Sequence, residues 1–146
     1  MTKRLTLKTS AYENLLAHLV DMEERRVQLI NLYFQEYDKQ RDEFEHLMDS
    51  YISRMDDTVK NMECSENSDN YFPFVCLNSE IEIEDIEESE TYSYRIIIPE
   101  TIHGGDNCIT MLSPMGRALL CKNEGEIVSV DTPSGVYRYR IKSIRI

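Results

Sequence analysis

Three carboxylates stand close together in the segment Asp42-Glu43-Phe44-Glu45-His46. Paired carboxylates supply the hard oxygen ligands that Mg²⁺ prefers, so these acids could contribute to a site for a divalent cation. The alternative is that Asp42, Glu43 and Glu45 are solvated acids of a helix turn. His46 is interpreted as a surface residue rather than a general base, because nothing else in the sequence supports catalysis.

The cysteines do not have the spacing of a metal site. Cys64, Cys76, Cys108 and Cys121 form no C-x-x-C pair, and the three histidines are scattered among them. Zinc sites need ligands at short, regular spacings, so we expect free thiols in a reducing cytoplasm and no metal or cofactor of the chain's own.

The chain carries 16 basic and 27 acidic residues and a net charge of −11. Such a protein is repelled by bare nucleic acid, because that affinity comes mainly from cations that displace phosphate counterions. The charge suits a partner with a basic surface, or serves solubility alone. The N-terminal residues lack the apolar core of a secretory signal, and no apolar run is long enough to span a bilayer. We therefore expect a cytoplasmic protein without a membrane partner.

The first half of the chain has a helical pattern. All five glycines and all four prolines follow residue 70, so the strongest helix breakers are missing before it. Ser10 and Glu13 are spaced as a capping box. Apolar residues then recur at steps of three and four in two series, which predicts two helices with one apolar face each. The series are Leu15, Leu19, Met22, Leu29 and Tyr33, with Arg26 as a break, and then Phe44, Met48, Tyr51, Met55, Val59 and Met62.

A polar stretch from Gln35 to Glu43 separates the two series. A turn there makes residues 1–70 an antiparallel coiled-coil hairpin with its tip near 36–45, which can be monomeric. A single uninterrupted helix that dimerises is the other possibility, since no glycine or proline marks the turn. We favour the hairpin.

Residues 71–146 have the pattern of an antiparallel sheet with one short helix. Strands are predicted over 80–84, 92–98 and 108–112, and a last hairpin joins 127–130 to 136–141. Ser113-Pro114 begins the helix, with serine as its cap and proline in the first turn. Arg138 and Arg140 alternate with apolar residues, which predicts a basic strand face that is either solvated or a docking surface. The fold class is therefore α+β.

Two C-terminal motifs resemble those of the GreA/GreB transcript-cleavage factors. Residues 109–120, ITMLSPMGRALL, resemble the S-P-x-[AG]-x-A-L-[IL]-G-K segment, and residues 125–135, GEIVSVDTPSG, resemble G-D-x-V-x-V-x-T-P-x-G. Leu77-Asn78-Ser79 and Ile98-Pro99-Glu100 look more like Rnk, the regulator of nucleoside diphosphate kinase, which belongs to the same superfamily. The similarity covers about residues 75–146, while the N-terminal part agrees only in length, helical pattern and the position of Arg25-Arg26.

This resemblance implies an FKBP-like C-terminal domain that docks on RNA polymerase near its secondary channel, into which the hairpin inserts. The docking residues that it implies are Ser113, Pro114, Met115, Arg117 and Lys122. In the family the hairpin tip carries D-L-x-E-N, whose two acids help to hold a second Mg²⁺ in the polymerase active site. Here Asp42 and Glu45 keep the D-x-x-E spacing, but a gapless comparison puts Arg41 and Phe44 where the acids belong.

The altered tip favours a polymerase-binding regulator that has no catalysis of its own and does not read DNA sequence. An active cleavage factor that uses Asp42, Glu43 or Glu45 is the alternative within the family. A dimeric coiled-coil adaptor unrelated to polymerase is a second alternative. A prolyl isomerase is disfavoured, because Trp is absent and Phe is rare after Phe74.

Overall fold

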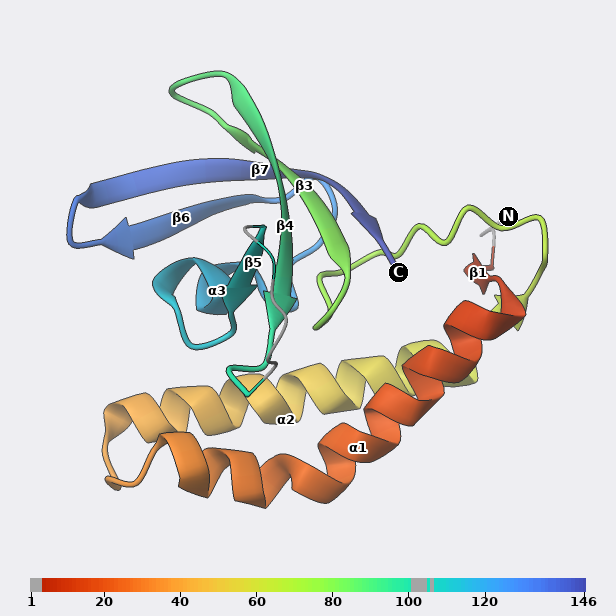
Figure 1. Ribbon diagram of the computed structural model, residues 1–146, viewed down its shortest axis with the longest axis horizontal. Helices are drawn as coiled ribbons and strands as arrows, with labels where there is room; N and C mark the ends of the chain where they lie inside the picture. Colours follow the sequence, from red (N-terminus) through yellow and green to blue (C-terminus); the bar gives the residue numbers. More distant parts are fainter. Residues whose placement is uncertain (1–3, 101–104, 106) are drawn as a thin grey trace. The chain divides into compact units, whose positions relative to one another are not determined.

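The computed structural model describes residues 4–100, 105 and 107–146 and divides the chain into two compact units, Met1–Asp69 and Asn70–Ile146 (Figure 1). The first unit contains two long helices and a small two-stranded sheet, and the second contains a five-stranded sheet with one short helix. None of the helices in the described residues is both long and apolar enough to cross a membrane.

Helices α1 (Thr9–Tyr33) and α2 (Lys39–Lys60) form an antiparallel hairpin, which confirms the prediction of two facing helices (Figure 1). At 1.5 Å per residue their 25 and 22 residues span about 38 Å and about 33 Å. All six predicted residues of the second series are buried, and so are four of the first. Tyr33 is only half-buried, and Ile30 and Phe34 are buried instead, because the chain leaves the helical path at residue 34.

The predicted capping box at Ser10 is wrong. Helix α1 begins one residue earlier, and its N-cap Lys8 makes no side-chain cap bond. The backbone N–H of Thr9 instead donates to Glu66 Oε1 at 3.2 Å, a bond from beyond the second helix. Hydrogen bonds from Thr9 lower the pKa of the Glu66 carboxyl. The helix start is thus fixed by a long-range partner rather than by its own first turn.

The hairpin base is held by a short parallel pairing that the sequence did not suggest. Strand β1 (Thr6–Leu7) pairs with β2 (Glu63–Cys64), so residues before α1 and after α2 lie side by side. Leu7 is fully buried there. The Ser68 hydroxyl donates to the Thr6 carbonyl at 2.9 Å and adds a further link between these segments.

The second unit is built on a sheet with the strand order β5-β4-β3-β7-β6. All pairings are antiparallel except β4 with β5, which is parallel and corrects the expectation of a wholly antiparallel sheet. Helix α3 packs against β5 and β6 (Figure 1). The elements are β3 (Glu80–Asp85), β4 (Glu90–Ile97), β5 (Cys108–Thr110), α3 (Pro114–Leu119), β6 (Ile127–Thr132) and β7 (Gly135–Arg145).

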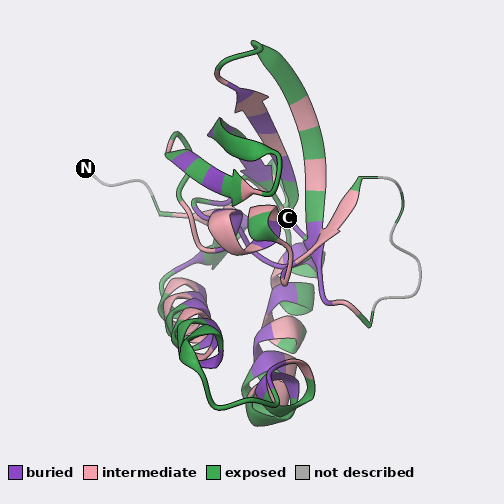
Figure 2. Cartoon of the chain, turned by 90° about the vertical axis from the view of Figure 1, so that its left-hand side faces the viewer, coloured by how far each residue is buried: buried purple, intermediate pink, exposed green. Residues whose placement is uncertain are grey.

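Buried and more exposed residues alternate along the strands of this sheet, so one face is buried and the other is solvated and charged. The alternation is visible as bands along the strands (Figure 2). The buried face includes Ile81, Ile83, Ile141 and Ile144, as expected for strands that have one solvated side. The charged face carries ion pairs between neighbouring strands, which we call the ionic ladder. Its pairs are Arg95–Glu80 at 4.0 Å, Lys142–Glu82 at 3.7 Å, Arg140–Glu84 at 3.8 Å and Arg138–Glu87 at 2.8 Å.

The ionic ladder changes the interpretation of the basic strand face. Arg138 and Arg140 do alternate with inward-facing residues, but each lies beside a carboxylate from β3 or from the turn that follows it. Opposite charges on neighbouring strands stabilise a sheet, although exposed pairs contribute little individually. This face is therefore close to neutral rather than basic.

Gly116 is the point at which helix α3 meets the sheet. A Cβ built on it would lie 2.0 Å from the Thr110 carbonyl oxygen and 3.0 Å from the Met111 Cα. Both neighbours are backbone atoms, so no side chain can move aside. Only glycine allows the helix to approach β5 this closely.

We predict that Gly116→Ala destabilises the C-terminal unit, because the methyl group forces helix and strand apart. The free energy of unfolding should fall by about 1–3 kcal/mol or more, measured by urea denaturation. Gly105→Ala is the matched control, since a Cβ added at Gly105 would have no atom within 4 Å. Equal stability of the two variants would contradict this account of the contact.

His18 generates a pH prediction for the hairpin. Its Nε2 lies 2.7 Å from the Tyr51 hydroxyl across the seam, and burial lowers the pKa of the imidazole although nearby Asp21 opposes this. The unfolded chain therefore takes up a proton near pH 6.5, whereas His18 in the folded chain does so only at a lower pH, so stability falls as the pH drops below about 6.5.

Between pH 7.5 and pH 5.5 the chain should lose more free energy of unfolding than the His18→Gln variant. The carboxylates common to both proteins cancel in this comparison. His46→Gln, which removes an exposed imidazole from the same helix pair, should behave like the unmodified chain. Parallel pH profiles for the chain and His18→Gln would show that His18 is not responsible.

Candidate functional site

The turn between the two helices is built from residues 34–38 and contains neither glycine nor proline. Asp38 is the N-cap of α2, and its side chain accepts a hydrogen bond from the Arg41 backbone N–H at 3.0 Å. The rings of Phe34 and Phe44 stack with their centroids 4.6 Å apart. Apolar stacking and an ordinary helix cap thus close the turn.

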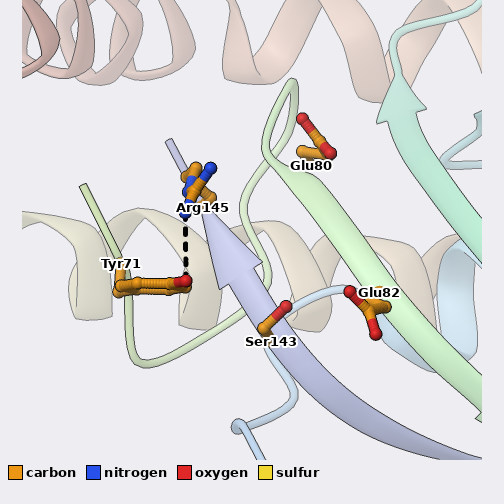
Figure 3. A pocket seen from close by; sticks show the side chains of 5 residues that line it. All are labelled: Tyr71, Glu80, Glu82, Ser143 and Arg145. Atoms are coloured by element: carbon orange, nitrogen blue, oxygen red, sulfur yellow. Dashed lines mark hydrogen bonds between the residues drawn. The ribbon is translucent and has the colours of Figure 1, made fainter. Parts of the chain in front are cut away.

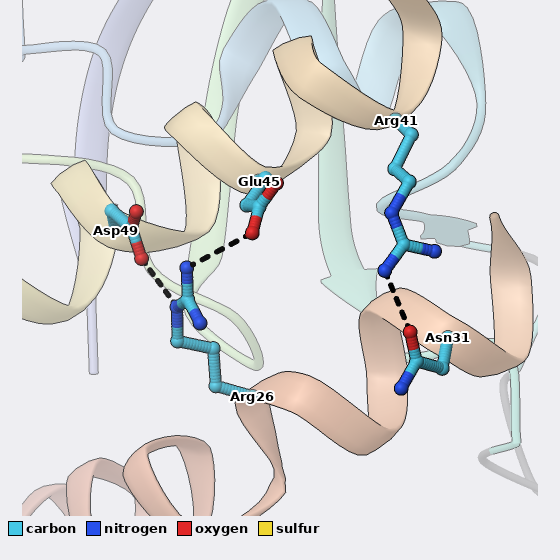
Figure 4. Close-up of polar contacts among 5 residues, drawn as sticks. All are labelled: Arg26, Asn31, Arg41, Glu45 and Asp49. Atoms are coloured by element: carbon cyan, nitrogen blue, oxygen red, sulfur yellow. Dashed lines mark hydrogen bonds and ion pairs between the residues drawn. The ribbon is translucent and has the colours of Figure 1, made fainter. Parts of the chain in front are cut away.

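Hydrogen bonds from the Arg41 side chain connect this turn to the end of α1. The residue is only 9 % exposed, although arginine is rarely buried without partners. Its guanidinium donates to the Phe34 carbonyl and, at 2.6 Å, to Asn31 Oδ1 (Figure 4). It also lies 4.4 Å from the centroid of the exposed Tyr37 ring. One side chain therefore satisfies a carbonyl at the helix end and orders the turn.

The three tip acids of the sequence analysis occupy different environments. Asp42 and Glu43 are exposed in the first turns of α2, and Glu43 lies 3.8 Å from the Lys39 ammonium. Glu45 points instead toward α1, where its carboxylate lies 3.5 Å from the Arg26 guanidinium (Figure 4). Glu45 is therefore on the flank of the hairpin, beyond the turn.

Arg26, the residue that interrupts the apolar series of α1, connects the two helices through ion pairs. It donates to Asp49 and approaches Glu45, both on α2 (Figure 4). The hydrogen bond to Asp49, followed by the charges of both acids, raises the pKa of the guanidinium. A carboxylate that already faces a cation is a weaker ligand for a second one. The geometry thus sets Glu45, which pairs across the hairpin with Arg26, apart from Glu43, which pairs with Lys39 on its own helix.

The described residues contain no group of three or more His, Cys, Asp or Glu side chains arranged to hold a metal ion. Any metal role of the exposed tip acids would therefore depend on ligands from another molecule. His46 is exposed beside them, as the sequence analysis expected of a surface residue.

The residues implied in docking surround the start of α3. The Ser113 hydroxyl accepts from the Gly116 N–H at 3.0 Å and donates to the Thr110 carbonyl at 2.8 Å, so it caps the helix. Arg117 Nε donates to the Leu112 carbonyl at 3.1 Å. Pro114 is exposed, and Met115 and Lys122 are half-buried. Ser113 and Arg117 therefore shape this surface, while Pro114, Met115 and Lys122 present it.

A small open pocket of about 110 Å³ lies at one end of the ionic ladder (Figure 3). Its lining includes Glu80 and Glu82, which already pair with cations of the ladder. Arg145 Nη2 donates to the Tyr71 hydroxyl at 3.0 Å, and the guanidinium lies over that ring. The charged groups of this pocket are thus matched within the domain, and we assign it no ligand.

A family model described as transcription elongation factor GreA/GreB, C-terminal domain, matches residues 72–146, which is half of the chain. The chain belongs to the GreA/GreB family. The matched residues include α3 and every strand of the five-stranded sheet, so the sequence motifs that suggested the family lie in one folded unit.

Individual relatives agree with this assignment. The chain is 37 % identical over 95 residues to transcription elongation factor GreA of Syntrophobacter fumaroxidans, which covers 63 % of this chain and 61 % of the relative. It is 23 % identical to GreA of Dehalococcoides mccartyi over 99 % of both chains. With several other relatives the chain spans less than half of the relative's length.

The fold of the whole GreA/GreB-family chain has a counterpart among solved structures. A GreA/GreB factor from Nitrosomonas europaea is similar with a TM-score of 0.54 over 99 % of this chain and all of the other, at 19 % identity. This confirms the predicted fold class, a helical hairpin followed by a β-rich domain. The sequence analysis missed the buried Arg41, although it had placed Arg41 where the family tip has an acid.

We predict that Arg41→Ala loosens the tip, because it leaves the Phe34 carbonyl without its guanidinium donor. The free energy of unfolding should fall by about 1–3 kcal/mol, and the backbone amides of residues 34–38 should exchange faster with deuterium. Arg41→Lys should recover little of this, since an ammonium lacks the planar fork. Lys39→Ala is the control, because Lys39 is exposed in the same helical turn. Unchanged deuterium exchange in Arg41→Ala would show that the Arg41 guanidinium does not order the turn.

Proposed function

We propose that this GreA/GreB-family protein is a cytoplasmic RNA polymerase-binding regulator of transcription elongation. Its C-terminal domain docks on the polymerase, and its hairpin enters the secondary channel without stimulating transcript cleavage. The chain itself is not an enzyme and needs no cofactor in this role. One observation carries the last part of the proposal: the tip holds a buried arginine, and one of its expected acids faces a cation.

Family membership supports the docking step. The family match spans α3 and its surroundings, and Pro114, Met115 and Lys122 are available on that surface. The ionic ladder is a poorer docking surface, because its four cations are already matched by carboxylates. Charge matching within the domain weakens attraction to an outside partner.

The hairpin supports the channel step. It is a narrow two-helix rod, about 38 Å long on its longer arm, with its turn closed by Asp38 and Arg41. A rod whose turn is fixed loses little conformational entropy when it enters a confined space. The exposed acids at the turn would also be attracted to a basic surface inside such a channel.

The tip geometry argues against cleavage stimulation. Two-metal hydrolysis needs carboxylates that are free to share a second ion with the polymerase site. Glu45 is held toward Arg26 on the flank, and Arg41, in the first turn of α2, places its guanidinium against the Phe34 carbonyl beside the turn. A fixed positive charge near the tip disfavours a divalent cation by electrostatic repulsion.

We predict that the protein alone leaves RNA length unchanged in backtracked elongation complexes. At saturating concentration it should inhibit cleavage by a known cleavage factor, because both occupy one channel. Gel analysis of end-labelled RNA measures both effects. RNA that shortens with this protein alone, and no longer shortens with the Asp42→Ala/Glu45→Ala variant, would identify an active cleavage factor instead.

Two further variants test how inhibition arises. Met115→Ala/Lys122→Ala should relieve inhibition, because it removes two half-buried side chains of the proposed docking surface without touching the hairpin. Lys142→Ala, which removes a cation from the ionic ladder, should leave inhibition intact. No inhibition and no cleavage, together with a dimer by light scattering, would favour the coiled-coil adaptor.

A further inference from the structure

Four tyrosines lie on one side of the C-terminal sheet, and we call them the tyrosine face: Tyr92, Tyr94, Tyr137 and Tyr139. The strand register places them on the side that carries the apolar core. Tyr92 pairs with Ile83, and Tyr94 pairs with Ile81, whose side chains are fully buried. On the neighbouring strands Tyr139 pairs with Val128, and Tyr137 pairs with Val130. The core face of the sheet thus continues into a row of aromatic rings.

The tyrosine face is partly open to solvent. Tyr92 and Tyr94 are half-buried and stack with ring centroids 6.0 Å apart. Tyr137 is 36 % exposed, whereas Tyr139 is 9 % exposed and anchors the row. Burial, and then the charge of Asp85, raises the pKa of the Tyr139 hydroxyl. Large aromatic rings left partly exposed together are typical of surfaces that bind a partner.

Acidic residues border this face at the turn between β3 and β4. The Tyr92 hydroxyl donates to the Glu90 carboxylate, and this bond raises the pKa of the tyrosine to about 12. Asp85 lies opposite Tyr139 in the register but is only 6 % exposed, and its carboxylate accepts from the Glu88 N–H at 3.0 Å, so Glu90 is the accessible acid next to the rings. The cations of neighbouring β7, Arg138 and Arg140, belong to the ionic ladder on the other side of the sheet.

We propose that the tyrosine face, with the exposed Glu90 at its edge, docks an arginine-bearing segment of a partner protein. A guanidinium stacks on tyrosine rings and at the same time forms paired hydrogen bonds with a carboxylate. The chemistry present on this face is that combination of ring and acid. Nucleic acid is repelled by the same carboxylates. This surface does not include the proposed docking residues around α3, so either proposal can fail without the other.

The test uses the full chain labelled with ¹⁵N and a short synthetic peptide that contains alternating arginine and glycine. Titration should produce saturable NMR shifts confined to the β3–β4 turn, Tyr92, Tyr94 and Tyr137. A peptide with citrulline in place of arginine has the same shape without the charge and should bind at least fivefold more weakly. No polymerase is present, so the outcome is independent of channel binding.

Variants separate the rings from the acids. Tyr92→Ala/Tyr94→Ala should weaken the peptide at least fivefold, provided that its spectrum stays dispersed. Glu90→Gln keeps both rings and the fold, and it should weaken binding about threefold. Glu124→Gln removes an exposed acid elsewhere in the same domain and should have no effect.

Three results would overturn the proposal. Shifts spread over the exposed acids of both units would indicate attraction to net charge alone. Unchanged affinity in both Tyr92→Ala/Tyr94→Ala and Glu90→Gln would exclude this face. Equal binding of a neutral proline-rich peptide would assign the rings to a different class of partner.

Discussion

A hairpin turn without glycine or proline has to be held by side chains, and here Arg41 does this. The guanidinium reaches back across the turn to a carbonyl and an amide oxygen at the end of α1. Because both targets lie on the preceding helix, the bond fixes where α1 ends and where α2 can begin. The Phe34–Phe44 stack then starts the apolar seam directly below the turn. Buried residues along both helices therefore meet in one register that starts at the turn.

Arg41 also places a positive charge close to the acids at the start of α2. Opposite charges at short distance partly compensate each other. Arg26 has the corresponding effect farther along the hairpin, where it lies between Glu45 and Asp49. Each arginine thus links the end or the flank of α1 to residues near the start of α2. The contacts of Glu45 and Asp49 with Arg26 are contacts between the two helices, so these acids contribute to the pairing of the arms.

Much of the fold could be predicted from local pattern, but the contacts that depend on distant residues could not. Steps of three and four identified both helix seams, and Ser113-Pro114 identified α3, because these signals lie within one turn. The Ser10 cap failed since Glu66, more than fifty residues away, bonds the helix start instead. The parallel pairing of β4 with β5 likewise depends on long-range register. At the site, the sequence comparison showed only that Arg41 stands where the family motif has an acid. Its contacts with the end of α1 depend on where the chain turns, which the sequence does not mark with glycine or proline.

Cys121 has an unusual backbone conformation at a position where the family motif has glycine. The family segment has glycine where this chain has cysteine, directly after the helix of the docking surface. In the structure Cys121 has a φ of +70°, a left-handed conformation that glycine adopts without strain and other residues rarely adopt. Its N–H donates to the Val75 carbonyl at 3.0 Å, and the Lys122 carbonyl accepts from the Val75 N–H at 2.9 Å. Those paired bonds hold the residue in place, so a cysteine adopts here a backbone conformation that glycine adopts more readily. The backbone around α3 therefore depends on this pairing and on the close approach of Gly116 to the strand that precedes the helix.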